Sequence, residues 1–324
     1  MTDDAAPSGD NVPASTERIP HVAILMCTYN GATYLREQLD SFVAQTFSNW
    51  ALYVSDDAST DQTHEILAEY QRRWGNDRLT VFKGPCRGFA ANFIALVQRA
   101  ELNADYFAFS DQDDVWFSDK LSRSVNCLEA VGDHTPALYC SRTRLINARH
   151  QVTGLSPLFE KPPSFRNALV QSLAGANTML INQAARDRVL HLSEDVPVVA
   201  HDWLMYLLVT GSGGQVIYDA APSLDYRQHG ANLIGANTSA SDRIMRIHKM
   251  LSGRFMRWND SNLSILHRLE HLLTDENRYV LNCFENCRRS GFLKRIGAFR
   301  DAGVYRQTSQ GNLSLFLAVC LRKL

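Results

Sequence analysis

Continuous apolar runs alternate with helical patterns along the first third of the chain, which predicts an α/β fold. Residues 21–27 (HVAILMC) form an uninterrupted apolar run, as expected for a strand that is covered on both faces in a parallel sheet. Leu35, Leu39, Phe42 and Val43 then recur at helical spacing. A helix is therefore expected directly after the first strand.

The same alternation continues to residue 110. Strands are predicted over 50–55, 79–82 and 105–110, and helical stripes separate them. The stripes consist of Ile66, Leu67 and Tyr70, and of Phe93, Ile94 and Val97. Strand and helix in strict alternation indicate right-handed crossovers and a mostly parallel sheet.

Beyond residue 117 the pattern predicts further elements and a change of character near residue 239. The expected elements are helices over 118–131, 165–173 and 201–208, and strands over 137–147, 215–218 and 223–228. We expect a leader over 1–20, an α/β domain over 21–238 with halves 21–116 and 117–238, and a helical basic region over 239–324.

Charge is distributed unevenly along the 324 residues. The net charge is −1, which argues against a general nucleic-acid binder. Residues 241–324 hold 15 Lys and Arg against 7 Asp and Glu, so this region carries +8 and the rest −9. The basic region predicts a phosphate-rich or membrane-surface partner. Seven scattered cysteines favour a reducing, cytoplasmic compartment.

Polar clusters follow three of the predicted strands, at 28–30, 56–57 and 111–113. The carboxyl edge of an open α/β sheet is where ligands bind. Asp111 and Asp113 share one side of an extended chain, so their like charges predict a cation between them. Oxygen ligands suit Mg²⁺ or Mn²⁺ better than zinc. The alternative interpretation of each cluster is a helix cap or a turn.

Three of these segments resemble the family 2 inverting glycosyltransferases, which have a GT-A (Rossmann-like) fold. The segments are 28–30 (TYN), 55–61 (SDDASTD) and 110–116 (SDQDDVW), and the resemblance covers about residues 20–235. It implies sugar transfer from a nucleotide diphosphate. Residues 226–232 (YRQHGAN) are most similar to bacterial rhamnosyltransferases that build surface polysaccharides, such as O-antigen.

The resemblance implies roles for matching residues. Asp113 would hold the metal, and His229, which follows a strand, is a second candidate ligand that would favour manganese. The implied donor-binding residues are Thr28, Tyr29, Asn30, Asp57, Arg87, Asp111, Gly175 and Asn177. Arg227 is a candidate cation for the negative charge of the departing diphosphate.

The base is expected to be Asp202. Inverting transfer is a single displacement, so a carboxylate must take the proton of the attacking hydroxyl. The resemblance places that carboxylate at Asp202, where relatives usually carry Glu-Asp and this chain has His201-Asp202. An acid at a helix start is otherwise a cap.

Two rival interpretations stay open, a metal-dependent phosphohydrolase and a nucleotide-binding module without catalysis. In the leading one, the donor is a dTDP- or UDP-sugar and the acceptor is a glycan or a polyprenyl-diphosphate-linked oligosaccharide. The enzyme would work in the cytoplasm, in peripheral contact with the anionic inner face of the plasma membrane. An apolar stripe beside basic residues supports this contact, and it consists of Phe292, Leu293, Ile296 and Phe299.

Overall fold

A seven-stranded sheet forms the centre of the molecule in the computed structural model, which describes residues 18–193, 196–228 and 254–324. Its strand order is β10–β6–β9–β4–β1–β2–β3. The strands are β1 Val22–Thr28, β2 Trp50–Asp56, β3 Leu79–Lys83, β4 Tyr106–Ser110, β6 Ala137–Ser141, β9 Leu180–Asn182 and β10 Gln215–Asp219. Only β9 runs antiparallel to its neighbours, which confirms the expected mixed, mostly parallel sheet.

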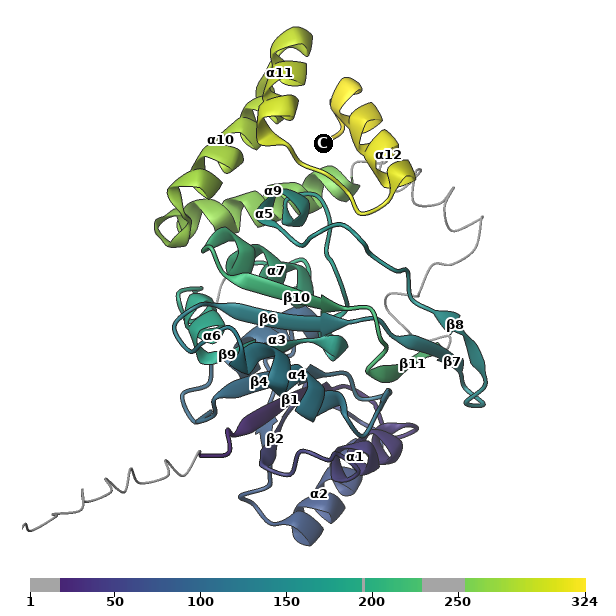
Figure 1. Ribbon diagram of the computed structural model, residues 1–324. Helices are drawn as coiled ribbons and strands as arrows, with labels where there is room; N and C mark the ends of the chain where they lie inside the picture. The colour runs from purple at the N-terminus through teal and green to yellow at the C-terminus, as the bar shows by residue number, and fades with distance from the viewer. Residues whose placement is uncertain (1–17, 194–195, 229–253) are drawn as a thin grey trace, which may run out of the picture.

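Helices cover both faces of this sheet (Figure 1). One face carries α1 Leu35–Val43, α2 Thr63–Trp74 and α4 Lys120–Glu129, and the other carries α3 Phe89–Val97, α6 Gln183–Leu190 and α7 His201–Gly211. Alternate residues of β1 enter the two separate cores, so every side chain from Val22 to Met26 is fully buried. This double burial explains the uninterrupted apolar run.

A second, four-stranded sheet stands at the carboxyl edge of the first. It has the order β5–β11–β7–β8, with β5 Val115–Trp116, β7 Arg144–Asn147, β8 Val152–Leu155 and β11 Leu224–Gln228. Strands β4, β6 and β10 of the large sheet each lead within a few residues into a strand of the small sheet (Figure 1). The joint between the two sheets is therefore built from three chain segments.

The expected single strand over 137–147 was wrong, because the chain divides into β6 and β7 in different sheets. The division falls at Arg142, whose amide donates to the Asp219 carbonyl at 3.0 Å. The hydroxyls of Ser141 and Ser223 lie 2.6 Å apart at the same point. These contacts turn both β6 and β10 towards the small sheet.

Two other local expectations also fail. The helix expected over 165–173 ends at Ala168, as α5 Phe165–Ala168, and the Ala168 carbonyl accepts a hydrogen bond from the indole of Trp203 at 2.7 Å. This hydrogen bond occupies the Ala168 carbonyl, which would otherwise accept a backbone amide from the next turn of the helix. Val43 is exposed, whereas the other three residues of its stripe are fully buried.

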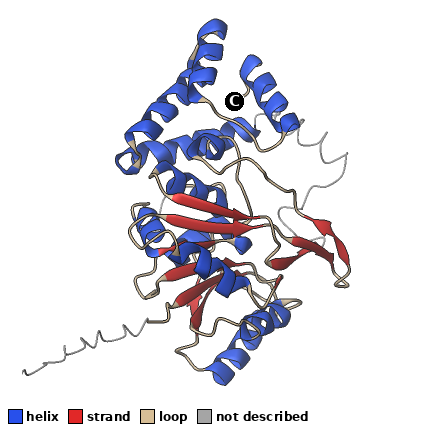
Figure 2. Ribbon diagram, in the orientation of Figure 1, coloured by secondary structure: helices blue, strands red, loops and turns tan. Residues whose placement is uncertain are grey.

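The C-terminal region is helical, as expected, and caps the α7 side of the sheet (Figure 2). It contains α9 Arg254–Arg268, a short 3₁₀ segment at Glu270–Leu272, α10 Asp275–Arg289, α11 Phe292–Ala302 and α12 Ser309–Cys320. Another 3₁₀ segment, Ala176–Thr178, precedes β9 in the central sheet. The apolar residues of the C-terminal region join the α7 core, and Trp258 packs edge-on against Trp203 at 6.3 Å. No helix within the described ranges is both long and apolar enough to span a membrane.

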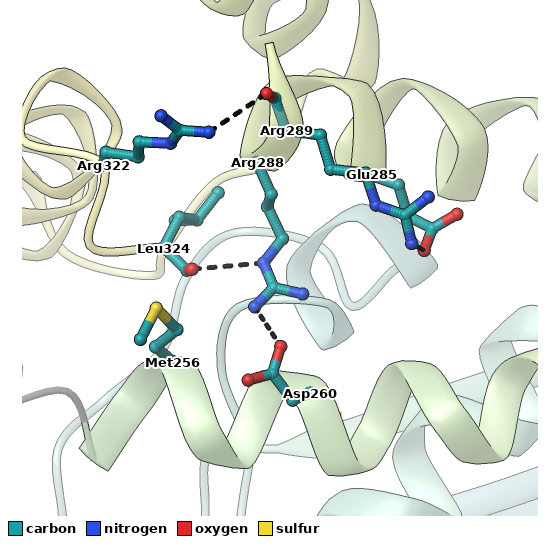
Figure 3. A pocket seen from close by; sticks show the side chains of 7 residues that line it. All are labelled: Met256, Asp260, Glu285, Arg288, Arg289, Arg322 and Leu324. Atoms are coloured by element: carbon teal, nitrogen blue, oxygen red, sulfur yellow. Dashed lines mark hydrogen bonds and ion pairs between the residues drawn. The ribbon is translucent and has the colours of Figure 1, made fainter.

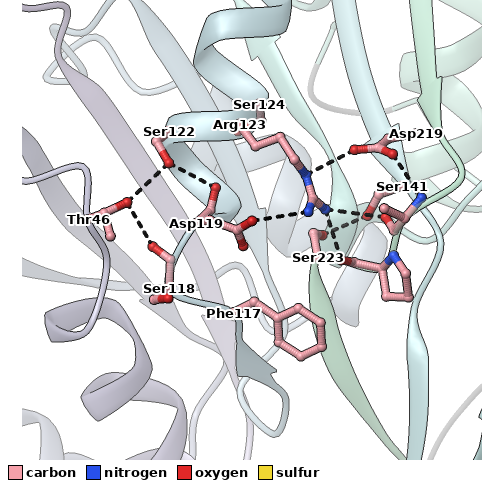
Figure 4. A network of polar contacts seen from close by, with 12 residues as sticks. Thr46, Phe117, Ser118, Asp119, Ser122, Arg123, Ser124, Ser141, Asp219 and Ser223 are labelled. Carbon is pink, nitrogen blue, oxygen red and sulfur yellow. Dashed lines mark hydrogen bonds and ion pairs between the residues drawn. The ribbon is translucent and has the colours of Figure 1, made fainter.

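A polar network around Arg123 of α4 ties the two sheets together (Figure 4). The guanidinium Nε lies 2.9 Å from Asp219 at the end of β10, and another nitrogen donates to the Pro222 carbonyl at 2.9 Å. The Tyr139 hydroxyl donates to the same Asp219 carboxylate at 2.8 Å. The network fixes the segment that carries β11 towards the joint.

We expect Arg123→Ala to lower the free energy of unfolding by about 2 kcal/mol, because several partly buried acceptors lose a charged donor. Chemical denaturation measures this loss. Arg36→Ala is the matched control, since it removes an exposed pair with Glu69 and should leave the free energy of unfolding close to that of the wild type. Equal effects of the two variants would contradict a structural role for the network.

Candidate active site

The three polar clusters predicted from strand ends meet at the joint between the sheets. Strands β1, β2 and β4 are neighbours, and Thr28 at the end of β1 stands in register with Asp56 of β2. The four residues 111–114 link β4 of the large sheet to β5 of the small sheet. The acidic cluster thus lies where the two sheets separate.

The loop after β1 is held from two sides. The Thr28 hydroxyl donates to Asp56 at 2.7 Å, and both residues are buried. The Gln112 side chain accepts from the Tyr29 amide at 2.9 Å and donates to the Tyr29 carbonyl at 3.0 Å. The Tyr29 side chain is exposed. Its backbone is therefore fixed while its ring is open to a ligand.

Gly31 leaves room for the Gln112 side chain in the position that holds Tyr29. A Cβ atom at Gly31 would stand 2.2 Å from Oε1 of Gln112. Asn30, one residue earlier, adopts a left-handed backbone (φ 48°), and its side-chain carbonyl accepts from the Thr60 amide at 2.8 Å. Asparagine tolerates this conformation better than most residues.

Asp57 binds the backbone of the loop that follows β3. Its carboxylate accepts the backbone amides of Cys86 at 2.6 Å and Gly88 at 3.1 Å. A Cβ at Gly84 would come within 2.7 Å of the same carboxylate, so the close approach requires glycine there. Arg87 lies in this loop and is exposed. Asp57 thus brings Arg87 to the edge where the nucleotide is expected.

At the joint, the carboxylate of Asp111 lies near enough to those of Asp113 and Asp202 for their charges to interact, and all three are partly exposed. Burial, together with the negative charges of Asp113 and Asp202, raises the pKa of Asp111 to about 7. Burial also raises the pKa of Asp202 to about 6. In the part of the chain that the structure describes, no lysine or arginine forms an ion pair with Asp111 or Asp202.

Asp202 stands in the first turn of α7, and the backbone amide of Trp203 donates to it at 2.7 Å. The Trp203 ring is anchored by the α5 carbonyl described above, which fixes the start of the helix. The structure therefore brings Asp202, from one segment, to Asp111 and Asp113, from another.

A second, buried layer supports the acidic cluster. Asp114 is fully buried and accepts from the Asn177 side chain at 2.6 Å and from the Arg227 amide at 3.3 Å. Burial and the charges of Asp111 and Asp113 raise the pKa of Asp114 well above its usual value. Gly175 lies beside Asn177, because a Cβ there would meet the Asn177 amide oxygen at 2.7 Å.

Arg227 is also part of this layer. Its side chain is fully buried, forms an ion pair with Glu37 of α1 and donates from Nε to the Asp113 carbonyl at 3.0 Å. The guanidinium stands over the Tyr34 ring at 4.5 Å. The sequence did not predict the ion pair between Arg227 and Glu37, nor the hydrogen bonds between Gln112 and Tyr29. Glu37 lies 190 residues from Arg227 in the chain and gives no local signal of the pairing.

His201, beside Asp202, is buried in an aromatic cluster. Its ring stacks on Phe93 at 4.1 Å and also contacts Phe89 and Phe109. Burial lowers the pKa of His201 to about 3, so the imidazole is neutral. A neutral residue here adds no charge next to Asp202.

The residues present fit a divalent cation that is shared with a bound diphosphate. Asp111 and Asp113 offer only carboxylate oxygens, the donors that Mg²⁺ and Mn²⁺ prefer. Among the described residues, no three His, Cys, Asp or Glu side chains gather as a ligand set. The remaining ligands would then be phosphate oxygens and water, as is usual for Mg²⁺. His229, the other predicted ligand, lies outside the described residues.

The fold, together with the polar residues at the carboxyl edge of the seven-stranded sheet, defines an α/β enzyme of the GT-A type, with its ligand site at the carboxyl ends of the central strands. Residues 23–185 match the family "Glycosyl transferase family 2", and the chain belongs to that family.

The chain is also similar in sequence to a known relative and in fold to two solved structures. It is 30% identical over 234 residues to the dTDP-rhamnosyl transferase RfbG of Shigella flexneri, covering 68% of this chain and 78% of that protein. S. aureus TarS 1–349 in complex with UDP-GlcNAc superposes with a TM-score of 0.50 at 14% identity, covering 88% of this chain and 93% of that one. GalNAc-T7 with UDP, GalNAc and Mn²⁺ superposes with a TM-score of 0.52 at 11% identity, covering 89% of this chain and 56% of that one. These structural likenesses confirm the fold.

Proposed function

We propose that this family 2 glycosyltransferase transfers L-rhamnose from dTDP-rhamnose to a hydroxyl group of a glycan, with inversion at the anomeric carbon. The choice of donor is supported by the similarity to RfbG and by the sequence of residues 226–232, which resembles that of the rhamnosyltransferases. A UDP-sugar is the alternative donor. We expect this transfer to be one step in the synthesis of a surface polysaccharide.

One observation carries the proposed mechanism, namely that Asp202 comes close enough to Asp111 for the two charges to interact. In the reaction, the acceptor oxygen forms a bond to the anomeric carbon as the bond from that carbon to the diphosphate breaks. The hydroxyl proton passes to the Asp202 carboxylate, and the nucleoside diphosphate leaves with the electron pair. No covalent intermediate is needed.

The donor is expected to lie across the ends of β1, β2 and β4. Tyr29 would pack against the base, while the backbone of the loop after β1 is held by Gln112. Asp57 and Arg87 would face the nucleotide from the loop after β3, and Thr28 and Asn30 would shape the loop itself. Gly175 and Asn177 are expected beside the donor sugar.

Asp113, with Asp111 beside it, is proposed to hold Mn²⁺ or Mg²⁺, and His229 remains the predicted additional ligand. When bound, the cation neutralises the negative charge that builds up on the departing diphosphate. Arg227 supports this step indirectly, since it holds the Asp113 carbonyl. Its contacts make it a positioning residue for the metal-binding loop.

The acceptor is expected to be a growing glycan or a polyprenyl-diphosphate-linked oligosaccharide, and the reaction is expected to take place in the cytoplasm. All seven cysteines lie in the described part of the chain and none forms a disulfide, which agrees with a reducing compartment.

A panel of nucleotide sugars tests the proposal, with release of nucleoside diphosphate measured in the presence of Mn²⁺ or Mg²⁺. We expect dTDP-rhamnose to be consumed fastest. If another donor alone is consumed, the assignment of rhamnose as the donor sugar is wrong, but the assignment of the protein as a glycosyltransferase stands. Hydrolysis of simple phosphate esters without sugar transfer would favour a phosphohydrolase, and nucleotide binding without any turnover would favour a binding module.

A further inference from the structure

From Leu315 to its end at Cys320, helix α12 is apolar on all sides, and one of its faces is exposed. No charged residue occurs between Gln307 and Leu321. One face of the helix is buried against the C-terminal region through Leu315, Ala318 and Val319. The opposite face carries large apolar side chains at helical spacing, with exposed fractions of 62% for Leu313, 43% for Phe316, 48% for Leu317 and 58% for Leu321. A helix that is apolar all round is normally covered.

Helix α11 extends this apolar face. Phe292 and Leu293 at its start are 57% and 85% exposed. The rings of Phe299 in α11 and Phe316 in α12 lie 6.2 Å apart, which joins the two helices. The α11–α12 surface is defined here as the exposed side chains of Phe292, Leu293, Leu313, Phe316, Leu317 and Leu321.

This surface lies at one end of the molecule, far from α1 and α2 (Figure 1). It holds six of the sixteen large apolar residues that are exposed in the described ranges, five within α11 and α12 and the sixth, Leu321, directly after α12. Scattered apolar residues are normal on a protein surface, whereas a cluster of this kind marks an interaction site.

Positive charge accompanies the apolar side chains. Residues 290–324 contain six Lys and Arg and a single acid, Asp301, so the segment carries +5. Lys294 and Arg300 on α11 are exposed, and Arg322 and Lys323 directly follow the apolar stripe of α12. Exposed apolar side chains next to exposed cations are complementary to a bilayer with anionic headgroups.

A nearby cavity of about 310 Å³ does not account for this charge (Figure 3). Its Arg288 is bound to Asp260 of α9 and to the Leu324 carbonyl, and its Arg289 pairs with Glu285. These cations are neutralised by carboxylates of the same cavity, and they hold α9, α10 and the end of the chain together. On α11, Arg300 lies near Asp301 and Arg295 is buried. Lys294 of α11, together with Arg322 and Lys323 after α12, is therefore the electrostatic partner for an anionic surface.

We propose that the α11–α12 surface lies in the interface of a bilayer that contains anionic phospholipid. Both helices are too short to span the hydrocarbon, so they would lie along the membrane plane with the apolar stripe inserted. This inference goes beyond sugar transfer and does not depend on the donor, the metal or the base.

Vesicle flotation of the full chain tests the proposal. We expect binding to vesicles of phosphatidylethanolamine with phosphatidylglycerol, weaker binding at high salt, and little binding to phosphatidylcholine alone. The triple variant Leu313→Gln, Leu317→Gln and Leu321→Gln should lower the partition coefficient by about tenfold or more, since three apolar side chains no longer insert.

A matched control changes three similarly exposed residues elsewhere. Val43→Gln, Val152→Gln and Leu190→Gln, at 59%, 58% and 44% exposure, should leave flotation unchanged. Circular dichroism verifies that both triple variants fold, and diphosphate release from the donor in solution should be equal for both. The proposal is overturned if wild type does not float with anionic vesicles, or if the α12 variant floats as well as wild type. Self-association of wild type that the α12 variant loses, without vesicle binding, would instead make the surface a contact between copies.

Discussion

Asp202→Asn is expected to lower kcat about a thousandfold while leaving nucleotide binding intact. The amide occupies the same space but cannot accept the proton of the attacking hydroxyl, and a positioned general base contributes about 10²- to 10⁴-fold. Steady-state transfer with saturating donor and acceptor measures the effect. Asp77→Asn, an exposed change in the turn after α2, serves as the matched control and should keep full activity.

The pH dependence of the transfer rate gives a second test of the role of Asp202. Because burial raises the pKa of Asp202 to about 6, the carboxylate is ionised above that pH and protonated below it. At saturating metal, which keeps the ligand carboxylate of Asp111 ionised, the rate should therefore fall as pH decreases through about 6, and Asp202→Asn should lack this acid limb. A variant that retains both the rate and the limb would show that another group takes the proton.

Asp113→Asn is the second large effect that we expect. Replacing a carboxylate ligand by an amide removes a negative charge from the cation site, and loss of one group that stabilises charge in the transition state costs about 10²- to 10³-fold in kcat. Titration with Mn²⁺ should show that the variant needs more metal for half-maximal rate. Unchanged rate and unchanged metal requirement would remove Asp113 from the metal site. The Asp77→Asn control applies here as well.

The central strands were predictable because of how they are covered. Strands β1, β2 and β4 are buried on both faces, so their sequences are continuous apolar runs that end abruptly in polar residues. The division of 137–147 into β6 and β7 was not predictable, since no Gly or Pro occurs in that segment. The bend depends on partners near residue 220, which are distant in the chain.

The same distinction applies to the candidate site. Asp111 and Asp113 were located because they end a buried strand, and their position relative to the sheet follows from topology. The residues that hold them were not located, because their signals are long-range. Arg227, for example, donates a hydrogen bond to the Asp113 carbonyl although the two residues lie 114 positions apart in the chain.

The most direct test of the account is calorimetric titration of the protein with dTDP and UDP, first with Mn²⁺ or Mg²⁺ and then after exhaustive chelation. If a cation held by Asp111 and Asp113 binds the diphosphate, affinity should fall by about tenfold or more without metal, and Asp113→Asn should reproduce much of that loss with metal present. Equal affinity for the nucleotide before and after chelation, in wild type and variant alike, would contradict the account.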